Sequence, residues 1–176
     1  MKEFDKKKYS KNIEKKLRSN LSRDEIINRA FQYHLAGNIP EASKYYQFFI
    51  NQGFKDHRIF SNYVLILKGF GKLKEAEITT RKAIELNPNY ALGHSNLGGI
   101  LNSLGKLKEA ELSTRKAIKL NPEYANAYYN LGNILRDLKK LSEAAISLKK
   151  TIKLKPNFFE AHRDLGICLY LLKDIN

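Results

Sequence analysis

The stretch GKLKEAEITTRKAIELNPNYA at residues 71–91 returns at residues 105–125 as GKLKEAELSTRKAIKLNPEYA, with 17 of 21 positions identical. A sequence that repeats itself every thirty-four residues is typical of an array of short structural units. In such an array no unit buries its apolar face alone, so each unit stacks on its neighbours. The sequence therefore predicts a repeat array, and the surface of such an array serves to bind other molecules.

Composition and charge narrow the class of protein further. The chain has 176 residues, 43% of them hydrophobic, and a formal net charge of +14. No apolar run approaches the roughly 18 residues of a membrane span, and residues 1–18 lack the apolar segment of a secretory signal. Cys168 is the only cysteine, which excludes an internal disulfide and fits a reducing compartment. We therefore expect a cytoplasmic protein without a membrane span.

Apolar residues between the repeated turns fall at helical spacing. One such stripe consists of Phe60, Tyr63, Val64 and Leu67. Gly71 follows it, at a position where a helix end commonly needs a left-handed residue, and Pro88 prevents the next helix from continuing. Equivalent helix-ending positions recur at Gly105 and Pro122, then at Lys139 and Pro156. No segment alternates with a period of two, so we predict an all-α fold.

The recurring positions resemble those of the tetratricopeptide repeat family, which has an aromatic residue, Leu-Gly, a small Ala and a late Pro at fixed spacing. In the unit from residue 91 these positions hold His94, Leu97, Gly98, Leu101, Ala110, Thr114 and Pro122. In the unit from residue 125 they hold Tyr128, Leu131, Gly132, Leu135, Ala144, Leu148 and Pro156. The resemblance implies a right-handed α-solenoid of antiparallel helix pairs, with about four repeats and a terminal helix.

We divide the chain into a tail and an array. Residues 1–21 form a basic tail, which is either disordered or a short amphipathic helix. Residues 22–176 form the array, and its units span about 23–56 (a degenerate repeat), 57–90, 91–124, 125–158 and 159–176 (a half repeat or terminal helix). Ser22 and Glu25 fit a capping box at the first helix, and Phe54 occupies the proline position of the degenerate repeat.

The final half repeat is apolar for a helix that ends an array. Its apolar residues are Leu165, Ile167, Leu169, Leu171, Leu172 and Ile175. A terminal helix normally carries a polar outer face. Three explanations stay open: an imperfect cap, self-association through this helix, or a natural chain that continues beyond Asn176.

The family resemblance places the first helix of each pair along a concave groove, where asparagines recur at Asn62, Asn96 and Asn130. An amide both donates and accepts hydrogen bonds, so this asparagine ladder is suited to hold a peptide backbone without reading its sequence. It resembles the ladder of the O-linked N-acetylglucosamine transferase array, although Asp164 stands at the fourth position. Further groove candidates are Ser95, Asn102, Asn126, Tyr129, Asn133 and Arg136. The alternative is that all of these are exposed polar positions without a ligand.

The residues contain no catalytic constellation, metal site or cofactor motif, so we predict a protein that is not an enzyme. His94 and His162 occupy the same position two units apart, and we expect them to fill an aromatic slot between helices. Cys168 lies in an apolar run, which predicts a buried packing thiol. No phosphate-binding loop of the GxxxxGK[ST] type is present.

Most lysines and arginines fall on second helices, which the resemblance places on the convex side. The rows are Lys72, Lys74, Arg81 and Lys82, then Lys106, Lys108, Arg115 and Lys116, then Lys149, Lys150, Lys153 and Lys155. Acids interrupt the rows at helical spacing, at Glu75, Glu77, Glu109 and Glu111. This pattern favours a salt-bridged, solvated face, and it makes RNA or other polyanion binding the weaker alternative.

The sequence thus predicts a protein-interaction scaffold that binds an extended peptide or a partner helix in its groove, with no small-molecule substrate. The family's clamp for the C-terminal carboxylate of chaperones is not expected, because Ser61 and Leu65 replace its opening Lys and Asn. The alternative is the substrate-recognition part of a larger transferase-type enzyme whose catalytic domain lies beyond residue 176.

Overall fold

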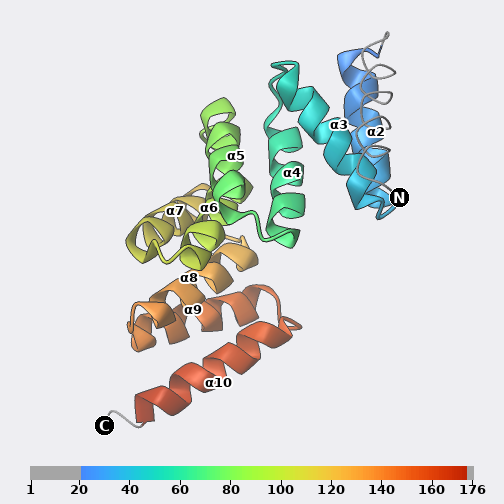
Figure 1. The fold of residues 1–176 in the computed structure, drawn as a ribbon. Helices are drawn as coiled ribbons and strands as arrows, with labels where there is room; N and C mark the ends of the chain where they lie inside the picture. The colour runs from blue at the N-terminus through green and yellow to red at the C-terminus, as the bar shows by residue number, and fades with distance from the viewer. Residues whose placement is uncertain (1–20, 174–176) are drawn as a thin grey trace, which may run out of the picture. The chain divides into compact units, whose positions relative to one another are not determined.

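The computed structural model describes residues 21–173, and this part of the chain folds into nine α-helices without a strand (Figure 1). The helices are α2 (Arg23–Leu35), α3 (Ile39–Asn51), α4 (His57–Gly69), α5 (Leu73–Leu86), α6 (Ala91–Ser103), α7 (Leu107–Leu120), α8 (Ala125–Asp137), α9 (Leu141–Leu154) and α10 (Phe159–Lys173). The fold is therefore all-α and of the helix-pair solenoid class, as predicted. None of the described helices combines the length and the apolar character that crossing a bilayer requires. The predicted tail falls almost wholly on residues 1–20, outside the described residues.

The chain forms two compact units, one that ends at Ile66 and one that begins at Leu67, within α4. In the first unit the predicted capping box is confirmed at the start of α2. The backbone N–H of Ser22 donates to Glu25 Oε2 at 2.8 Å, and the N–H of Glu25 donates to Ser22 Oγ at 3.3 Å. These two bonds satisfy N–H groups that a helix start otherwise leaves without partners.

The core of the first unit is aromatic. Tyr46 and Phe49 of α3 are fully buried. The ring of Phe54 lies 5.2 Å from the ring of Phe49, measured between centroids. The degenerate repeat thus replaces the expected proline with a side chain that packs against its own second helix.

In the second unit each helix from α5 to α10 packs against the next one along the chain. In addition α6 contacts α8, and α8 contacts α10, so the first helices of successive pairs line one side of this unit. We call this side the first-helix face. The second helices α5, α7 and α9 lie on the other side, where arginine and glutamate side chains connect them.

The turns inside the helix pairs adopt the left-handed conformation that the sequence predicts. Gly71 and Gly105 have φ angles of 69° and 74°. Lys139 takes the third place with φ 62°, and no other non-glycine residue of the described chain has a positive φ. The N–H of Lys140 then donates to the carbonyl oxygen of Leu135 at 2.8 Å, which closes the end of α8.

The terminal helix α10 carries apolar side chains at the surface, as its sequence indicates. The exposed ones are Phe159, Ile167, Leu169, Tyr170 and Leu171. Cys168 instead is fully buried, which confirms the predicted packing thiol, and burial raises the pKa of its thiol. Self-association through this helix stays a prediction.

Glycines on the first helices let the two helices of a pair approach closely. A Cβ atom added to Gly98 would lie 2.0 Å from Thr114 Oγ1 on α7. A Cβ atom added to Gly132 would lie 2.7 Å from Leu148 Cγ on α9. At Gly166 of α10, in contrast, such an atom would meet nothing within 4 Å. Only the first two glycines are therefore required by packing.

We expect Gly98→Ala to lower the free energy of unfolding by about 1–3 kcal/mol, because the new methyl group overlaps Thr114 and forces α6 and α7 apart. The matched control is Gly166→Ala in the open part of α10, which should instead stabilise the helix by up to about 1 kcal/mol. Urea denaturation followed by circular dichroism measures both changes. Equal stability of the two variants would contradict the close approach at Gly98.

Candidate functional site

The asparagine at the third ladder position is held by the neighbouring repeat. Asn130 of α8 donates its Nδ2 to the carbonyl oxygen and to the Oγ of Ser95 on α6, at 3.2 and 3.1 Å. Ser95 is only 2% exposed, and its side chain also interacts with the hydroxyl of Tyr124. The Oδ1 of Asn130 accepts no hydrogen bond from another described residue. The amide is thus fixed at its nitrogen, while its oxygen keeps its capacity to accept.

The fourth ladder position holds a buried carboxylate. Asp164 on α10 is 2% exposed and accepts hydrogen bonds from the Tyr129 hydroxyl at 3.0 Å and from Arg163 Nε at 2.9 Å. The guanidinium of Arg136 lies 3.8 Å from its Oδ2. The ring of Tyr129 also packs against Phe158, and burial together with the Asp164 carboxylate raises the pKa of its hydroxyl. Two predicted groove residues, Tyr129 and Arg136, therefore surround Asp164.

Two further amides of the first-helix face have buried oxygens without a donor. The Nδ2 of Asn102 donates to Asp137 Oδ2 at 3.1 Å. Its Oδ1 and the Oδ1 of Asn133 are buried and accept no hydrogen bond in residues 21–173. An unpaired buried acceptor costs about 1–3 kcal/mol.

The structure places eight of the nine predicted groove residues on α6 and α8. Asn96 is half-buried on α6, and its amide makes no hydrogen bond to another described residue, whereas Asn126 is exposed at the start of α8. Asn62 lies on α4, in the unit that ends at Ile66. The first-helix face of the second unit thus brings together the residues expected to hold a ligand.

Asn62 lines a pocket of about 320 Å³ in the first unit. The other lining residues are Phe31, His34, Leu35, Tyr46 and Leu65. Leu35 is 90% exposed, and the Nδ1 of His34 lies 2.9 Å from the hydroxyl of Tyr46, whose pKa is raised by burial. Sequence reasoning missed this pocket. The feature of the sequence that could have indicated this pocket is Leu65, an apolar residue at a position where the family's carboxylate clamp has Asn.

The histidines at the repeated position bond to the turn that precedes their helix. The Nε2 of His94 lies 2.9 Å from the Pro88 carbonyl oxygen, and the Nε2 of His162 lies 2.8 Å from that of Pro156. The ring of His162 points toward the preceding turn and is exposed. His162 therefore does not fill the expected slot between helices. Among the described residues, no group of three or more His, Cys, Asp or Glu side chains is arranged to hold a metal ion.

Comparison with known families agrees with this architecture. Family models described as tetratricopeptide repeat match residues 57–90 and 125–158, and a model described as TPR repeat matches residues 98–135. The chain belongs to the tetratricopeptide repeat family. No curated protein sequence gives a significant match.

Solved structures share the fold. MamA from Desulfovibrio magneticus RS-1 has a TM-score of 0.76 at 21% identity, and the match covers 86% of both chains. YrrB, described as a TPR protein with an unusual peptide-binding site, has a TM-score of 0.72 at 22% identity, covering 81% of this chain and 73% of that one. The first TPR of Spaghetti (RPAP3), solved with the HSP90 peptide SRMEEVD, has a TM-score of 0.64 at 26% identity, covering 66% and 93%.

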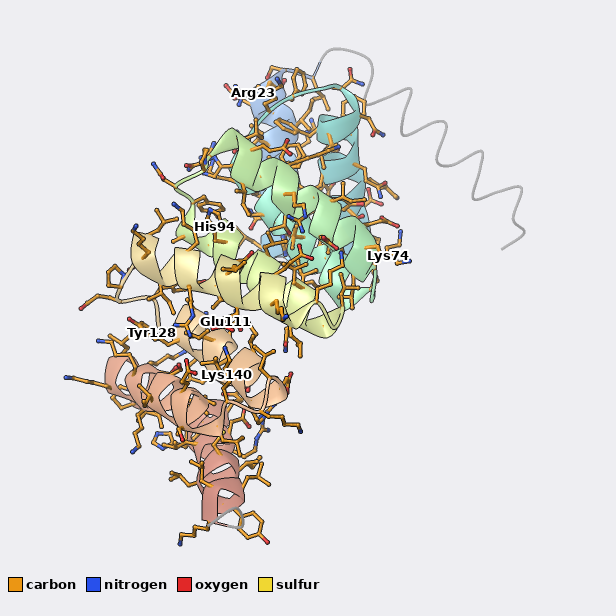
Figure 2. The ribbon with its side chains drawn as sticks, turned by 90° about the vertical axis from the view of Figure 1, so that its left-hand side faces the viewer. Arg23, Lys74, His94, Glu111, Tyr128 and Lys140 are labelled. Atoms are coloured by element: carbon orange, nitrogen blue, oxygen red, sulfur yellow. The ribbon has the colours of Figure 1, made fainter. Side chains whose placement is uncertain are left out.

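Part of the basic rows of the second helices is paired with acids, through Lys72, Arg81, Lys106 and Arg115. Glu77 accepts hydrogen bonds from Arg81 at 2.8 Å and from Lys106 at 2.9 Å. The next repeat copies this arrangement with Glu111, Arg115 and Lys140, and Figure 2 labels the first and last of these. The arginines also reach the following pair, in the contacts Arg81–Glu109 and Arg115–Glu143. Salt bridges therefore connect the first two basic rows, whereas Lys149, Lys150, Lys153 and Lys155 of the third row form none with another described residue.

We expect Glu77→Gln to lower the free energy of unfolding by about 0.5–1 kcal/mol near neutral pH. Hydrogen bonds from Lys106 and then Arg81 hold the pKa of Glu77 below its ordinary value of 4.5. A lowered pKa in the folded state stabilises the fold above the unfolded-state pKa, and the contribution is lost as the pH falls through the folded-state value. Wild type and variant should therefore differ in the free energy of unfolding at about pH 7, and urea denaturation should show this difference shrinking as the pH falls below 4.5.

The matched control is Glu75→Gln, which removes the same charge from an exposed pair with Lys72. It should change the free energy of unfolding much less than Glu77→Gln does. A difference between wild type and Glu77→Gln that persists undiminished at low pH would contradict the ionic origin of the effect.

Proposed function

We propose that this chain is a non-enzymatic protein-interaction scaffold that holds an extended peptide along the first-helix face of its second unit. The observation that carries the proposal is the Asn130 amide, which Ser95 fixes at its nitrogen while its Oδ1 keeps an unused acceptor site. An N–H of a peptide backbone is the natural donor for such an oxygen.

A fixed amide binds more favourably than a mobile one, because its conformational entropy is already lost on folding and is not lost again on binding. The contacts with Ser95 restrict the Asn130 side chain before a ligand arrives. Asn96, one repeat earlier, adds a second amide whose donor and acceptor sites are both unused by the described chain. Each bond contributes only about 0.5–1.5 kcal/mol net, so binding along this face depends on several of them.

The charged residues of the face supply selectivity in this proposal. Arg136 lies within 4 Å of both Asp164 and Asp137 without a hydrogen bond to either, at 3.8 and 3.7 Å. Its guanidinium therefore keeps donors for a carboxylate of the peptide. RPAP3, which has the same fold, was solved with a peptide that contains acidic residues, and this supports a peptide as the class of ligand.

The first unit offers a different contact. The pocket beside Asn62 is lined mainly by aromatic and aliphatic side chains and has room for one apolar side chain of a partner. Asn62 at its rim is placed to bond the backbone next to that side chain. We propose this pocket as an anchor for an apolar residue.

The test uses peptides selected against the full chain from a phage-displayed heptapeptide library. Replacing both Asn96 and Asn130 with Ala removes two amides from the first-helix face, which should weaken binding of the selected peptides by about 5- to 30-fold. Fluorescence anisotropy with labelled peptides measures the dissociation constants.

The matched control replaces Asn89 and Asn157, two exposed asparagines in turns, and should leave the affinity unchanged. Urea denaturation of both double variants corrects for the loss of the Asn130 contact with Ser95. Unchanged affinity of the Asn96→Ala/Asn130→Ala variant would refute the ladder, and failure to enrich any peptide would refute the scaffold function itself.

A further inference from the structure

The second unit has another hollow, away from the predicted groove residues. It has a volume of about 490 Å³ and lies between α7, α8 and α9. The lining residues are Arg115, Ile118, Lys119, Tyr128, Leu131, Ile146, Ser147 and Lys150. We call it the lateral pocket. None of the nine predicted groove residues belongs to it.

The lateral pocket combines an apolar interior with a basic rim. Ile118 and Leu131 belong to the packed interior around α8 and α9, while Ile146 is 68% exposed at the mouth. An isoleucine this exposed on a second helix contributes little to the core, so its apolar surface is available to a partner. Tyr128, labelled in Figure 2, supplies the aromatic part of the wall.

All charged residues that line the lateral pocket are cations. Arg115 is neutralised by Glu111 and Glu143, at 2.8 and 3.1 Å. Lys119 and Lys150 form no ion pair with another described residue, and the Nζ of Lys150 lies 5.8 Å from the centre of the Tyr128 ring. Unlike Arg115, these two lysines are available to carboxylates of a ligand.

Comparison with the preceding repeat shows which lining residues of the lateral pocket are not repeated there. The two near-identical copies at 71–91 and 105–125 differ at four positions, and one of these four replaces Glu85 with Lys119. Thirty-four residues before Tyr128 stands His94, whose ring nitrogen contacts Pro88 instead. Two lining residues of the lateral pocket, Lys119 and Tyr128, thus differ in chemistry from their counterparts Glu85 and His94 in the preceding repeat.

We propose that the lateral pocket binds an acidic segment of a partner protein that carries one bulky apolar side chain. The apolar side chain enters between Tyr128 and Ile146, and carboxylates on either side of it pair with Lys119 and Lys150. The apolar interior favours this ligand over RNA, whose phosphates would use the lysines and leave Ile118, Leu131 and Ile146 uncovered. This proposal does not depend on peptide binding at the first-helix face.

The experiment measures binding of the full chain to the labelled peptide GDEFEDG by fluorescence anisotropy at about 0.15 M salt, where long-range charge effects are screened. The comparison ligands are GDESEDG, which keeps the charges and lacks the aromatic side chain, and a uridine pentanucleotide. GDEFEDG should bind at least about tenfold more tightly than either. Equal binding of all three ligands, or no binding of GDEFEDG up to about 1 mM, would overturn the proposal.

Two pairs of charge reversals locate the site. The double variant Lys119→Glu/Lys150→Glu should weaken binding of GDEFEDG at least about tenfold. The matched control Lys116→Glu/Lys149→Glu changes the net charge equally at exposed lysines of the same two helices outside the pocket, and should weaken binding less than about threefold. Equal losses in the two variants would show that only net charge matters and would overturn the proposal.

Two more variants separate this site from the rest of the chain. Ile146→Ser should abolish the preference for GDEFEDG over GDESEDG, since it removes exposed apolar surface at the mouth of the pocket. The Asn96→Ala/Asn130→Ala variant should bind GDEFEDG as wild type does. A loss of binding in that variant would place the peptide on the first-helix face and refute the lateral pocket.

Discussion

The close approach of the two helices in a pair is the constraint on which the second unit depends. At Gly98 a hydrogen atom stands where any side chain would overlap Thr114, and the Thr114 hydroxyl in turn donates to the Ala110 carbonyl at 2.8 Å. A short amide such as that of Asn130 can reach Ser95 in the preceding pair only if the pairs also stack closely. The polar contacts of the unit therefore depend on the close packing of its helices.

The lengths of the bridging side chains differ between the two sides of this unit. On the first-helix face short groups join α6 to α8, in the pairs Ser95–Asn130 and Asn102–Asp137, while the longer Tyr129 of α8 reaches Asp164 on α10. On the side of the second helices the contacts come from arginine, lysine and glutamate, in pairs such as Arg81–Glu109. Short side chains suffice between α6 and α8, whereas arginine spans the separation from α5 to α7 and from α7 to α9. The polar composition of each side thus follows from the spacing of its helices.

Local features of the fold could be predicted from the sequence, because each depends on a few neighbouring residues. The capping box at Ser22, the left-handed residue at Lys139 and the buried thiol of Cys168 are of this kind. Contacts between repeats were not predicted, since helix register across thirty-five residues sets them: Ser95–Asn130, Asn102–Asp137 and Tyr129–Asp164 are all separated by that number. A search for polar residues separated by the repeat length plus one would have found these contacts. The groove role of these residues stays a prediction.

Sequence differences between successive repeats fall both on residues that pack between repeats and on residues at the surface. The position of Glu77 and Glu111 becomes Ala145 in the next repeat, which is 5% exposed and packs with Leu148 and Cys168. The ionic contacts of the second helices therefore give way to an apolar interface as α9 meets α10. Lys119 shows the opposite kind of change, because it alters charge at a surface position and leaves the stacking residues as they were. The acidic ligand that we propose for the lateral pocket would account for this charge reversal, which the packing of the repeats does not require.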